Sequence, residues 1–164
     1  MDTFPRDLVI TACANYGPQL SVPDGLDPVK VMTAIASNES TFGANCGPRR
    51  EPAFDAGGVY ATGAQAALVA QYGSAAASSF GPWQMLFPNF QSRDVDALHT
   101  DLDLLATEFV RFFNQYVIGL RKASTLAEIG EVWNAGHVMA TPGPGVQRYC
   151  QELQTAYDAA TGMS

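Results

Sequence analysis

The carboxyl group of Glu39 is the first candidate for a catalytic group in this sequence. Glu39 follows Met32, Ile35 and Ala36 at helical spacing, so the four side chains share one face of an expected helix. A carboxyl on an apolar helix face is disfavoured as an anion, and its pKa should rise. A raised pKa lets a general acid keep its proton near neutral pH. The competing interpretation is a helix-terminal glutamate that simply meets solvent.

Two further short motifs carry side chains suited to sugars. Residues 81–84 predict a tight Gly-Pro turn, after which Trp83 and Gln84 open a helical turn. Trp133 and Asn134 lie near the C-terminal end of another expected helix, which a glycine closes. Aromatic faces stack on sugar rings, and amides bond hydroxyl and N-acetyl groups. Taken singly, these motifs are better explained as a buried tryptophan and an ordinary helix end.

The order and spacing of the three motifs resemble the lytic transglycosylases of the lysozyme-like superfamily. In that family a helix ends in Glu-Ser, a Gly-Leu-Met-Gln turn follows, and Tyr-Asn-Ala-Gly precedes a final helix. The chain carries comparable motifs in this order: Glu39-Ser40, Gly81-Pro82-Trp83-Gln84 and Trp133-Asn134-Ala135-Gly136. The segment 144–149 also resembles the family's ending, and the whole resemblance covers about residues 28–155.

This resemblance implies one lysozyme-like domain over 1–164 that cleaves the glycan strands of peptidoglycan. Glu39 would protonate the oxygen linking N-acetylmuramic acid to N-acetylglucosamine, and the substrate's N-acetyl group would attack the anomeric carbon. The ionised Glu39 would then take the proton of the C6 hydroxyl, which yields a 1,6-anhydro sugar without water. No metal or cofactor is implied. The resemblance assigns contacts with the substrate to Ser40, Trp83, Gln84, Trp133, Asn134 and Tyr149.

Departures from the family pattern leave the product open. Trp133 stands where the family has tyrosine, and an indole offers only a donor N–H. The segment 49–55 is longer than the common form and contains Glu51 and Asp55. An inverting hydrolase needs a second carboxylate about 6.5–9.5 Å from the first to activate water. Goose-type lysozymes, of the same superfamily, use acids in a comparable downstream region.

Three alternatives therefore stand beside lytic transglycosylation. A muramidase would hydrolyse the same bond, with Glu51 or Asp55 as a second catalytic group. Glu51 would otherwise form a surface ion pair with Arg49 or Arg50. A non-catalytic glycan-binding module is less favoured because it would not need an acid at position 39, and a purely structural helical protein would leave the motifs as coincidence.

The elements that must position these residues are helical. Asp27 and Pro28 predict a helix start, since an N-cap acceptor precedes a proline at the first helical position. Thr125 and Glu128 form a capping-box pattern. No strand pattern is convincing, although 57–61 is a candidate, and 43–52, 74–82 and 141–145 are expected loops. We expect five to seven helices: 7–16, 28 through 39, 63–72, 94–120 with a break near Thr100, 125–136 and a last helix from Val146.

Composition narrows the class of protein further. With 164 residues, 47% of them apolar, the chain suits one compact domain with a core. The net charge of −7 and nine scattered basic residues argue against binding to nucleic acid. No stretch approaches the about 18 apolar residues that span a membrane, and the first twenty residues lack a clean secretory signal. These features favour a phage endolysin or virion-associated enzyme, made in the host cytoplasm and acting on the cell wall.

The cysteines and histidines are not expected to do chemistry. Cys13, Cys46 and Cys150 are too few for a disulfide framework and have no zinc-site spacing. They are interpreted as small buried hydrophobes, with one bridge and a leftover thiol as the alternative. His99 is interpreted as a structural or solvated residue, and His137 as a complement to a helix C-terminus or a residue of the cleft wall.

Overall fold

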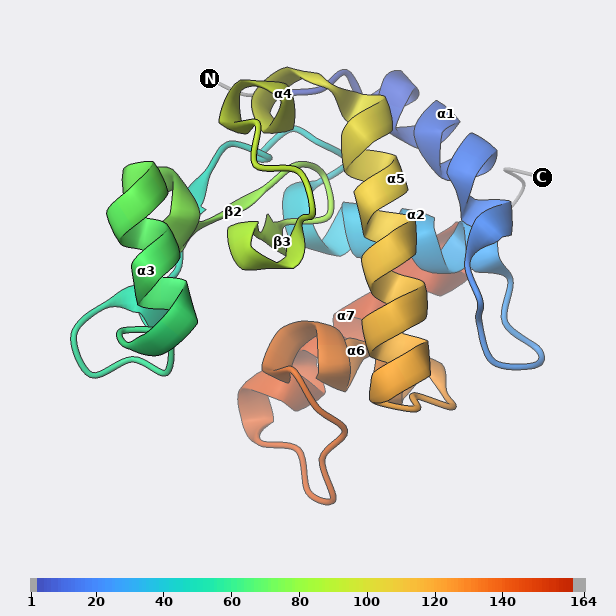
Figure 1. Cartoon of the computed structure of the whole chain (residues 1–164). Helices are drawn as coiled ribbons and strands as arrows, with labels where there is room; N and C mark the ends of the chain where they lie inside the picture. Colours follow the sequence, from blue (N-terminus) through green and yellow to red (C-terminus); the bar gives the residue numbers. More distant parts are fainter. Residues whose placement is uncertain (1–2, 161–164) are drawn as a thin grey trace.

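The structure is a computed structural model that describes residues 3–160, and it is mainly helical (Figure 1). Helix accounts for 63% and strand for 4%, which confirms the predicted mainly α class. Short 3-10 turns connect several helices. Within 3–160 the α-helices are α1 Arg6–Tyr16, α2 Pro28–Ser40, α3 Gly63–Tyr72, α4 Val95–Thr100, α5 Leu102–Phe112, α6 Leu126–Ala135 and α7 Pro144–Ala159.

The helices begin and end largely where capping residues predict. The Asp27 side chain accepts hydrogen bonds from the backbone N–H groups of Val29 and Lys30, at 2.9 and 3.1 Å. Asp101 caps α5 in the same way, which explains the break near Thr100 in the long periodic segment. Thr125 Oγ1 accepts from the N–H of Glu128 at 3.2 Å, as the capping-box pattern predicts.

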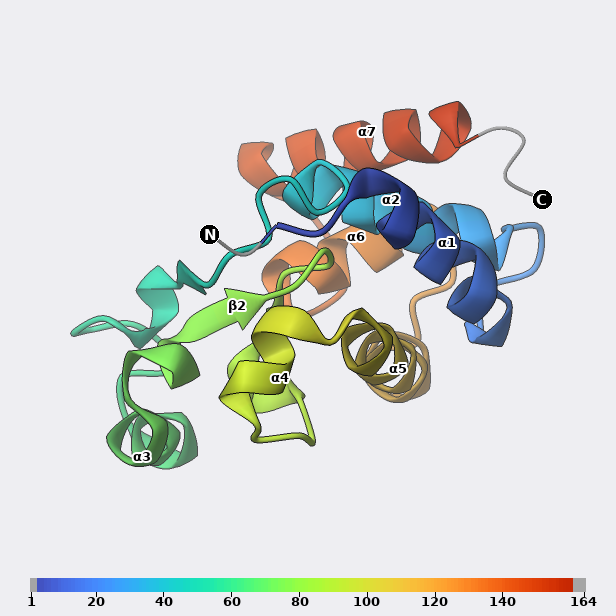
Figure 2. The same ribbon diagram turned by 90° about the horizontal axis from the view of Figure 1, so that it is seen from above.

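Helix α2 lies at the centre of the molecule and carries the residue of greatest interest. It packs against α1 and α7, and α7 also packs along α6 (Figure 2). Its residues Val31, Met32, Ala34, Ile35 and Ala36 are fully buried. A helix buried on most of its surface makes a rigid support for a side chain at its end.

A small antiparallel sheet lies beside this helical body, and the backbone in and around it differs from four expectations. Its strands are β1 Arg49–Arg50, β2 Ser78–Phe80 and β3 Met85–Leu86, in the order β1-β2-β3. The expected loops 43–52 and 74–82 therefore contain strands. The candidate strand 57–61 consists of turns instead. Residues 81–84 form the hairpin turn between β2 and β3 rather than the start of a helix.

The long helical pattern ends in a stretch of different geometry. Residues Phe113–Leu120 form a π-helix, whose i→i+5 hydrogen bonds widen each turn. Apolar side chains spaced for an α-helix, at 3.6 residues per turn, do not stay on one face of a π-helix. Leu120, expected in the core, is therefore 64% exposed.

The cysteines form no disulfide in the described part of the chain. Cys13 and Cys46 are buried and Cys150 is half-buried. Burial raises the pKa of the Cys13 thiol to about 12, which keeps it protonated and unreactive. The buried-hydrophobe interpretation is confirmed for Cys13 and Cys46. None of the helices within 3–160 combines the length and the apolar character needed to cross a membrane.

Candidate active site

Glu39 sits in the last turn of α2, and an unusual backbone turn fixes its position. After the helix, Thr41, Phe42 and Gly43 adopt φ values of 52°, 56° and 86°. The N–H of Thr41 donates to Ala36 O and Ser37 O, and the N–H of Phe42 also donates to Ala36 O at 3.1 Å, so these bonds close the helix. Three consecutive left-handed residues are rare, and such strain often accompanies a functional site.

Ser40 stabilises this turn rather than facing a ligand. Its hydroxyl donates to Ala36 O at 3.1 Å and accepts from the N–H of Gly43 at 2.8 Å. The residue is 1% exposed. The Ser40 hydroxyl, a predicted contact with the substrate, is therefore buried and satisfied within the protein, and it lines neither pocket.

The Glu39 carboxyl is largely withdrawn from water. Its side chain is 11% exposed, and burial raises its pKa. Hydrogen bonds from Tyr149 and Trp133 and the charge of Arg49 lower the pKa, while the charge of Glu51 raises it; the net direction is upward. The negative end of the α2 dipole also disfavours the carboxylate. The predicted raised pKa at position 39 is confirmed in direction.

Tyr149 is the closest hydrogen-bond donor to this carboxyl. Its hydroxyl, on α7, donates to Glu39 Oε1 at 2.6 Å. Burial and the nearby Glu39 charge raise the pKa of Tyr149 well above 10, so the phenol stays protonated and keeps donating. Residues 110 positions apart in sequence thus meet because α2 and α7 pack side by side.

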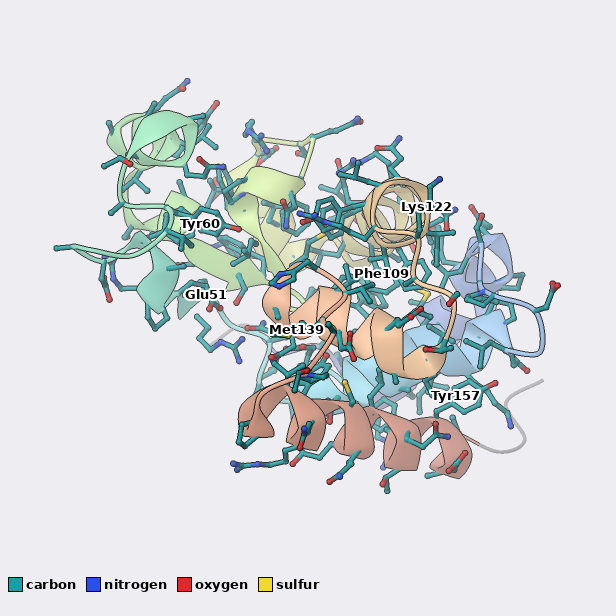
Figure 3. The ribbon with its side chains drawn as sticks, turned by 90° about the horizontal axis from the view of Figure 1, so that it is seen from below. Glu51, Tyr60, Phe109, Lys122, Met139 and Tyr157 are labelled. Atoms are coloured by element: carbon teal, nitrogen blue, oxygen red, sulfur yellow. The ribbon has the colours of Figure 1, made fainter. Side chains whose placement is uncertain are left out.

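Glu39 opens into a groove formed by two adjoining pockets. The pocket that includes Glu39 has a volume of about 350 Å³, and its neighbour has about 470 Å³. Figure 3 views the molecule from below and labels Glu51, Tyr60 and Met139 on the segments surrounding this region. The two pockets are continuous because they share the lining residues Glu51, Gln84, Leu86, Trp133 and Asn134.

Trp133 and Asn134 line both pockets, as expected of side chains that meet a ligand. The Trp133 ring packs against Phe109 and Phe112, with centroids 5.1 and 5.9 Å away. The indole favours the ionised form of Glu39 and is the smallest of the influences that lower the pKa of that carboxyl. The indole thus acts as a donor, which is the one hydrogen-bonding role open to it. Asn134 is exposed, which leaves its amide accessible from the groove.

Trp83 does not reach the groove. It is 1% exposed, and its Nε1–H donates to the backbone oxygen of Met32 in α2 at 3.2 Å. Its ring centroid lies 5.1 Å from that of Phe109. Trp83, a predicted contact with the substrate, therefore belongs to the core and lines neither pocket. This tryptophan instead joins the hairpin turn to the central helix.

Gln84 lines both pockets although most of its surface is buried. Its backbone has φ +47°, which turns the chain into β3. Its amide nitrogen donates to Gly81 O at 3.0 Å, and its amide oxygen lies 2.9 Å from Ser79 Oγ. Neutral hydrogen-bonding groups held this firmly suit a polar, uncharged part of a ligand.

The two candidate second carboxylates have different surroundings. Glu51 lines both pockets, pairs with Arg49 Nε at 3.1 Å and lies 2.8 Å from Ser79 Oγ. Asp55 pairs with Arg50 at 2.6 Å, on exposed side chains, and lines neither pocket. Asp55, one of the two predicted water-activating groups, is therefore placed outside the lining of both pockets. Glu51 combines both predicted features, an ion pair with Arg49 and a place in the groove.

Several lining residues had no signal in the sequence. Tyr60, in the loop before α3, follows no pattern that marks it. Phe112 and Tyr116 belong to the periodic face expected in the core, but their nearly parallel rings line the larger pocket. Arg49 is recognisable only as half of a basic pair. Its approach to Glu39 depends on the undetected strand β1.

The histidines lie outside the groove lining. His99 packs edge-on against Phe80 with ring centroids 5.3 Å apart, which agrees with a structural role. His137 Nδ1 lies 3.1 Å from the carbonyl oxygen of Ala135, at the C-terminal end of α6. This contact agrees with the expected complement to a helix C-terminus.

Comparisons with known proteins add no family assignment. The chain matches no family model, and neither the curated proteins nor the solved structures contain a match. Within residues 3–160 there is no cluster of three or more histidine, cysteine, aspartate or glutamate side chains suited to a metal ion. The functional proposal therefore rests on the groove and on the motifs that converge there.

Proposed function

We propose that this chain cleaves the glycan strands of peptidoglycan between N-acetylmuramic acid and N-acetylglucosamine, with Glu39 as general acid and then base. One observation carries the proposal: a buried carboxyl with a raised pKa lies at a groove lined by aromatic and amide side chains. A raised pKa supplies the proton, and the lining suits acetylated sugars. A binding module without activity has no need of such a proton.

The proposed reaction is lytic transglycosylation. Glu39 donates its proton to the glycosidic oxygen as the bond from that oxygen to the anomeric carbon breaks, and the substrate's N-acetyl oxygen bonds to the same carbon. The C6 hydroxyl oxygen then displaces the acetyl oxygen, and the Glu39 carboxylate accepts the hydroxyl proton. A 1,6-anhydro sugar results, no water is consumed, and one carboxyl of the protein suffices.

The surroundings of Glu39 suit both halves of this cycle. Burial favours the neutral acid before the first proton transfer. The Tyr149 hydroxyl, the Trp133 indole and the Arg49 guanidinium stabilise the carboxylate that forms afterwards. The Tyr149 hydroxyl already donates to Oε1, and the Arg49 charge lies 3.9 Å from Oε2, so the carboxylate forms without large rearrangement of its partners.

Glu39→Gln tests the proposal directly. The amide keeps the size of the side chain but carries no acidic proton, so cleavage of purified peptidoglycan should fall about 100-fold or more. Release of soluble fragments, followed by mass spectrometry, measures it. Asp55→Asn is the matched control and should retain activity, because Asp55 lies outside the groove. Wild-type activity in Glu39→Gln, with an unchanged circular dichroism spectrum, would contradict the acid role.

Hydrolysis of the same bond is the second candidate, because Glu51 lines the same groove as Glu39. In that reaction Glu51 would activate a water across the sugar ring. The products separate the two candidates, since the anhydro sugar is lighter than the hydrolysis product by the mass of one water. A large loss in Glu51→Gln with a hydrolysed product supports the muramidase, and a small loss with an anhydro product supports the transglycosylase. The phage setting expected from the sequence stays a prediction.

A further inference from the structure

Arg49 differs in charge from every other residue of the groove. Among the lining residues that the structure describes, it is the one lysine or arginine, beside two acidic residues and otherwise neutral ones. It lies on β1, where it pairs with Ser79 of β2, and its side chain is 57% exposed. The guanidinium is therefore held at its base by the sheet and reaches solvent at its tip.

The hydrogen-bonding capacity of this guanidinium is only partly used. Nε donates to Glu51 Oε1 at 3.1 Å. The terminal nitrogen Nη2 lies 3.9 Å from Glu39 Oε2, which is beyond hydrogen-bond distance. A guanidinium carries five N–H donors in a planar fork, and its two terminal nitrogens together match the two oxygens of a carboxylate. This edge of Arg49 is available to a ligand beside Glu39.

We propose that Arg49 makes the groove selective for glycan whose sugar carries a carboxylate, on its lactyl ether or the peptide attached there, beside the bond to be cut. The inference rests on the proposed function and names the feature of the substrate that is recognised. It distinguishes peptidoglycan from chitin, a polymer of N-acetylglucosamine without carboxylates. Chitin would fill the groove and leave the guanidinium edge without a partner.

Two electrostatic arguments support local recognition of this kind. The net charge of −7 repels anionic polymers at long range, so selection for a carboxylate must come from a short-range contact. A bidentate arginine–carboxylate contact provides direction as well as attraction. A ligand carboxylate bound there also lies near Glu39, where its negative charge favours the protonated acid that starts the reaction.

Rates on three substrates test the proposal: intact peptidoglycan, naked glycan strands freed of peptides, and the hexamer of N-acetylglucosamine. Arg49→Gln removes a charge beside Glu39 and should slow cleavage of every substrate, but the loss of kcat/KM should be larger by about tenfold or more on a carboxylate-bearing substrate than on the hexamer, with the extra loss mainly in KM. An extra loss on naked strands alone assigns the contact to the lactyl carboxylate, which in intact peptidoglycan is bonded to the peptide as an amide. An extra loss on both substrates means that Arg49 binds whichever carboxylate the sugar carries. An extra loss on intact peptidoglycan alone assigns the contact to the peptide. An equal loss on the hexamer would overturn the proposal, since Arg49 would then act only on Glu39.

Two controls complete the design. Arg50→Gln makes the same change at the next residue, whose guanidinium faces Asp55 outside the groove, and should leave all three rates unchanged. Arg49→Lys keeps the charge but not the fork and should restore only part of the selectivity.

Binding to Glu39→Gln, measured by calorimetry, separates this inference from the proposed reaction. Tighter binding of naked or peptide-bearing strands than of the hexamer, lost in the Arg49→Gln double variant, supports the carboxylate site even if the wild type cleaves nothing. Equal affinity for all three ligands, or affinity unchanged by the second substitution, rejects it.

Discussion

Two opposite influences act on the carboxyl of Glu39. Burial raises its pKa, and the donors around it, with Tyr149 foremost, lower it. Tyr149→Phe removes a hydroxyl 2.6 Å from Oε1 and leaves the ring. The pKa of Glu39 should rise further, because the carboxylate loses a hydrogen bond. The alkaline limb of the rate profile should therefore move to higher pH, and the rate at neutral pH should fall about tenfold as the second step loses a stabilised base.

Tyr157→Phe is the matched control for this prediction. It removes a hydroxyl from the same helix, where Tyr157 accepts a hydrogen bond from the backbone N–H of Asp27. Stability should fall slightly, while the pH dependence of cleavage stays where it is. If Tyr149→Phe likewise left the pH profile unmoved, the hydroxyl would have no part in controlling the proton of Glu39.

At the scale of the element, the turn that ends α2 is the feature on which the site depends. Gly43 has φ +86°, and a Cβ there would lie 2.9 Å from a Val9 methyl and 3.0 Å from Phe4 O. Gly43→Ala should cost about 1–3 kcal/mol of unfolding free energy and reduce cleavage, because Glu39 is four residues away. Gly57→Ala is the control, since Gly57 has φ +85° with nothing within 4 Å. Equal losses of unfolding free energy in the two variants, measured by urea unfolding, would show that the positive φ alone sets the cost and that the contacts of the added Cβ do not matter.

The elements also explain which features could be predicted from sequence. Local signals suffice for α2, because Asp27 caps it and its apolar spacing places Glu39 on the buried face. The position of Trp83 depends on its hydrogen bond to the carbonyl of Met32, 51 residues away in the sequence. The presence of a tryptophan at position 83 therefore could not distinguish stacking on a sugar from burial. Strands of two or three residues are too short to show the alternation of polar and apolar residues that reveals a strand. Because β1 could not be predicted, the place of Arg49 in the groove could not be predicted either.

At the scale of the whole molecule, Glu108 and its partly buried ion-pair partner Arg111, both on α5, join the segment after the sheet to the helical body. Glu108 on α5 accepts hydrogen bonds from the backbone N–H groups of Gln91 and Ser92 and pairs with Arg111 at 2.8 Å. Arg111 also donates to the carbonyl of Asn89, a residue of the groove wall. These contacts of Glu108 and Arg111, which we call the α5 latch, hold one wall of the groove against the helical body.

The pKa of Glu108 in this latch leads to a prediction about the stability of the protein at acid pH. Burial raises the pKa of Glu108, but the hydrogen bonds from Gln91 and Ser92 and the Arg111 charge lower it more, and the net direction is downward. A carboxyl with a lowered folded pKa contributes stability that is fully present above its unfolded pKa of about 4.3 and is lost as pH falls through the folded value. Glu108→Gln should therefore cost about 2 kcal/mol near pH 7, with the difference from wild type shrinking below about pH 4.3.

Urea unfolding between pH 7 and pH 3 measures this difference. Glu152→Gln, at an exposed position of α7, makes the same chemical change outside the latch and should leave stability within about 0.5 kcal/mol of wild type. The loss in Glu108→Gln should also loosen the wall that carries Asn89, so KM for the glycan should rise while kcat changes little. A penalty that stayed constant down to pH 3 would mean that the charge of Glu108 is not what holds the wall, and that packing of its side chain suffices.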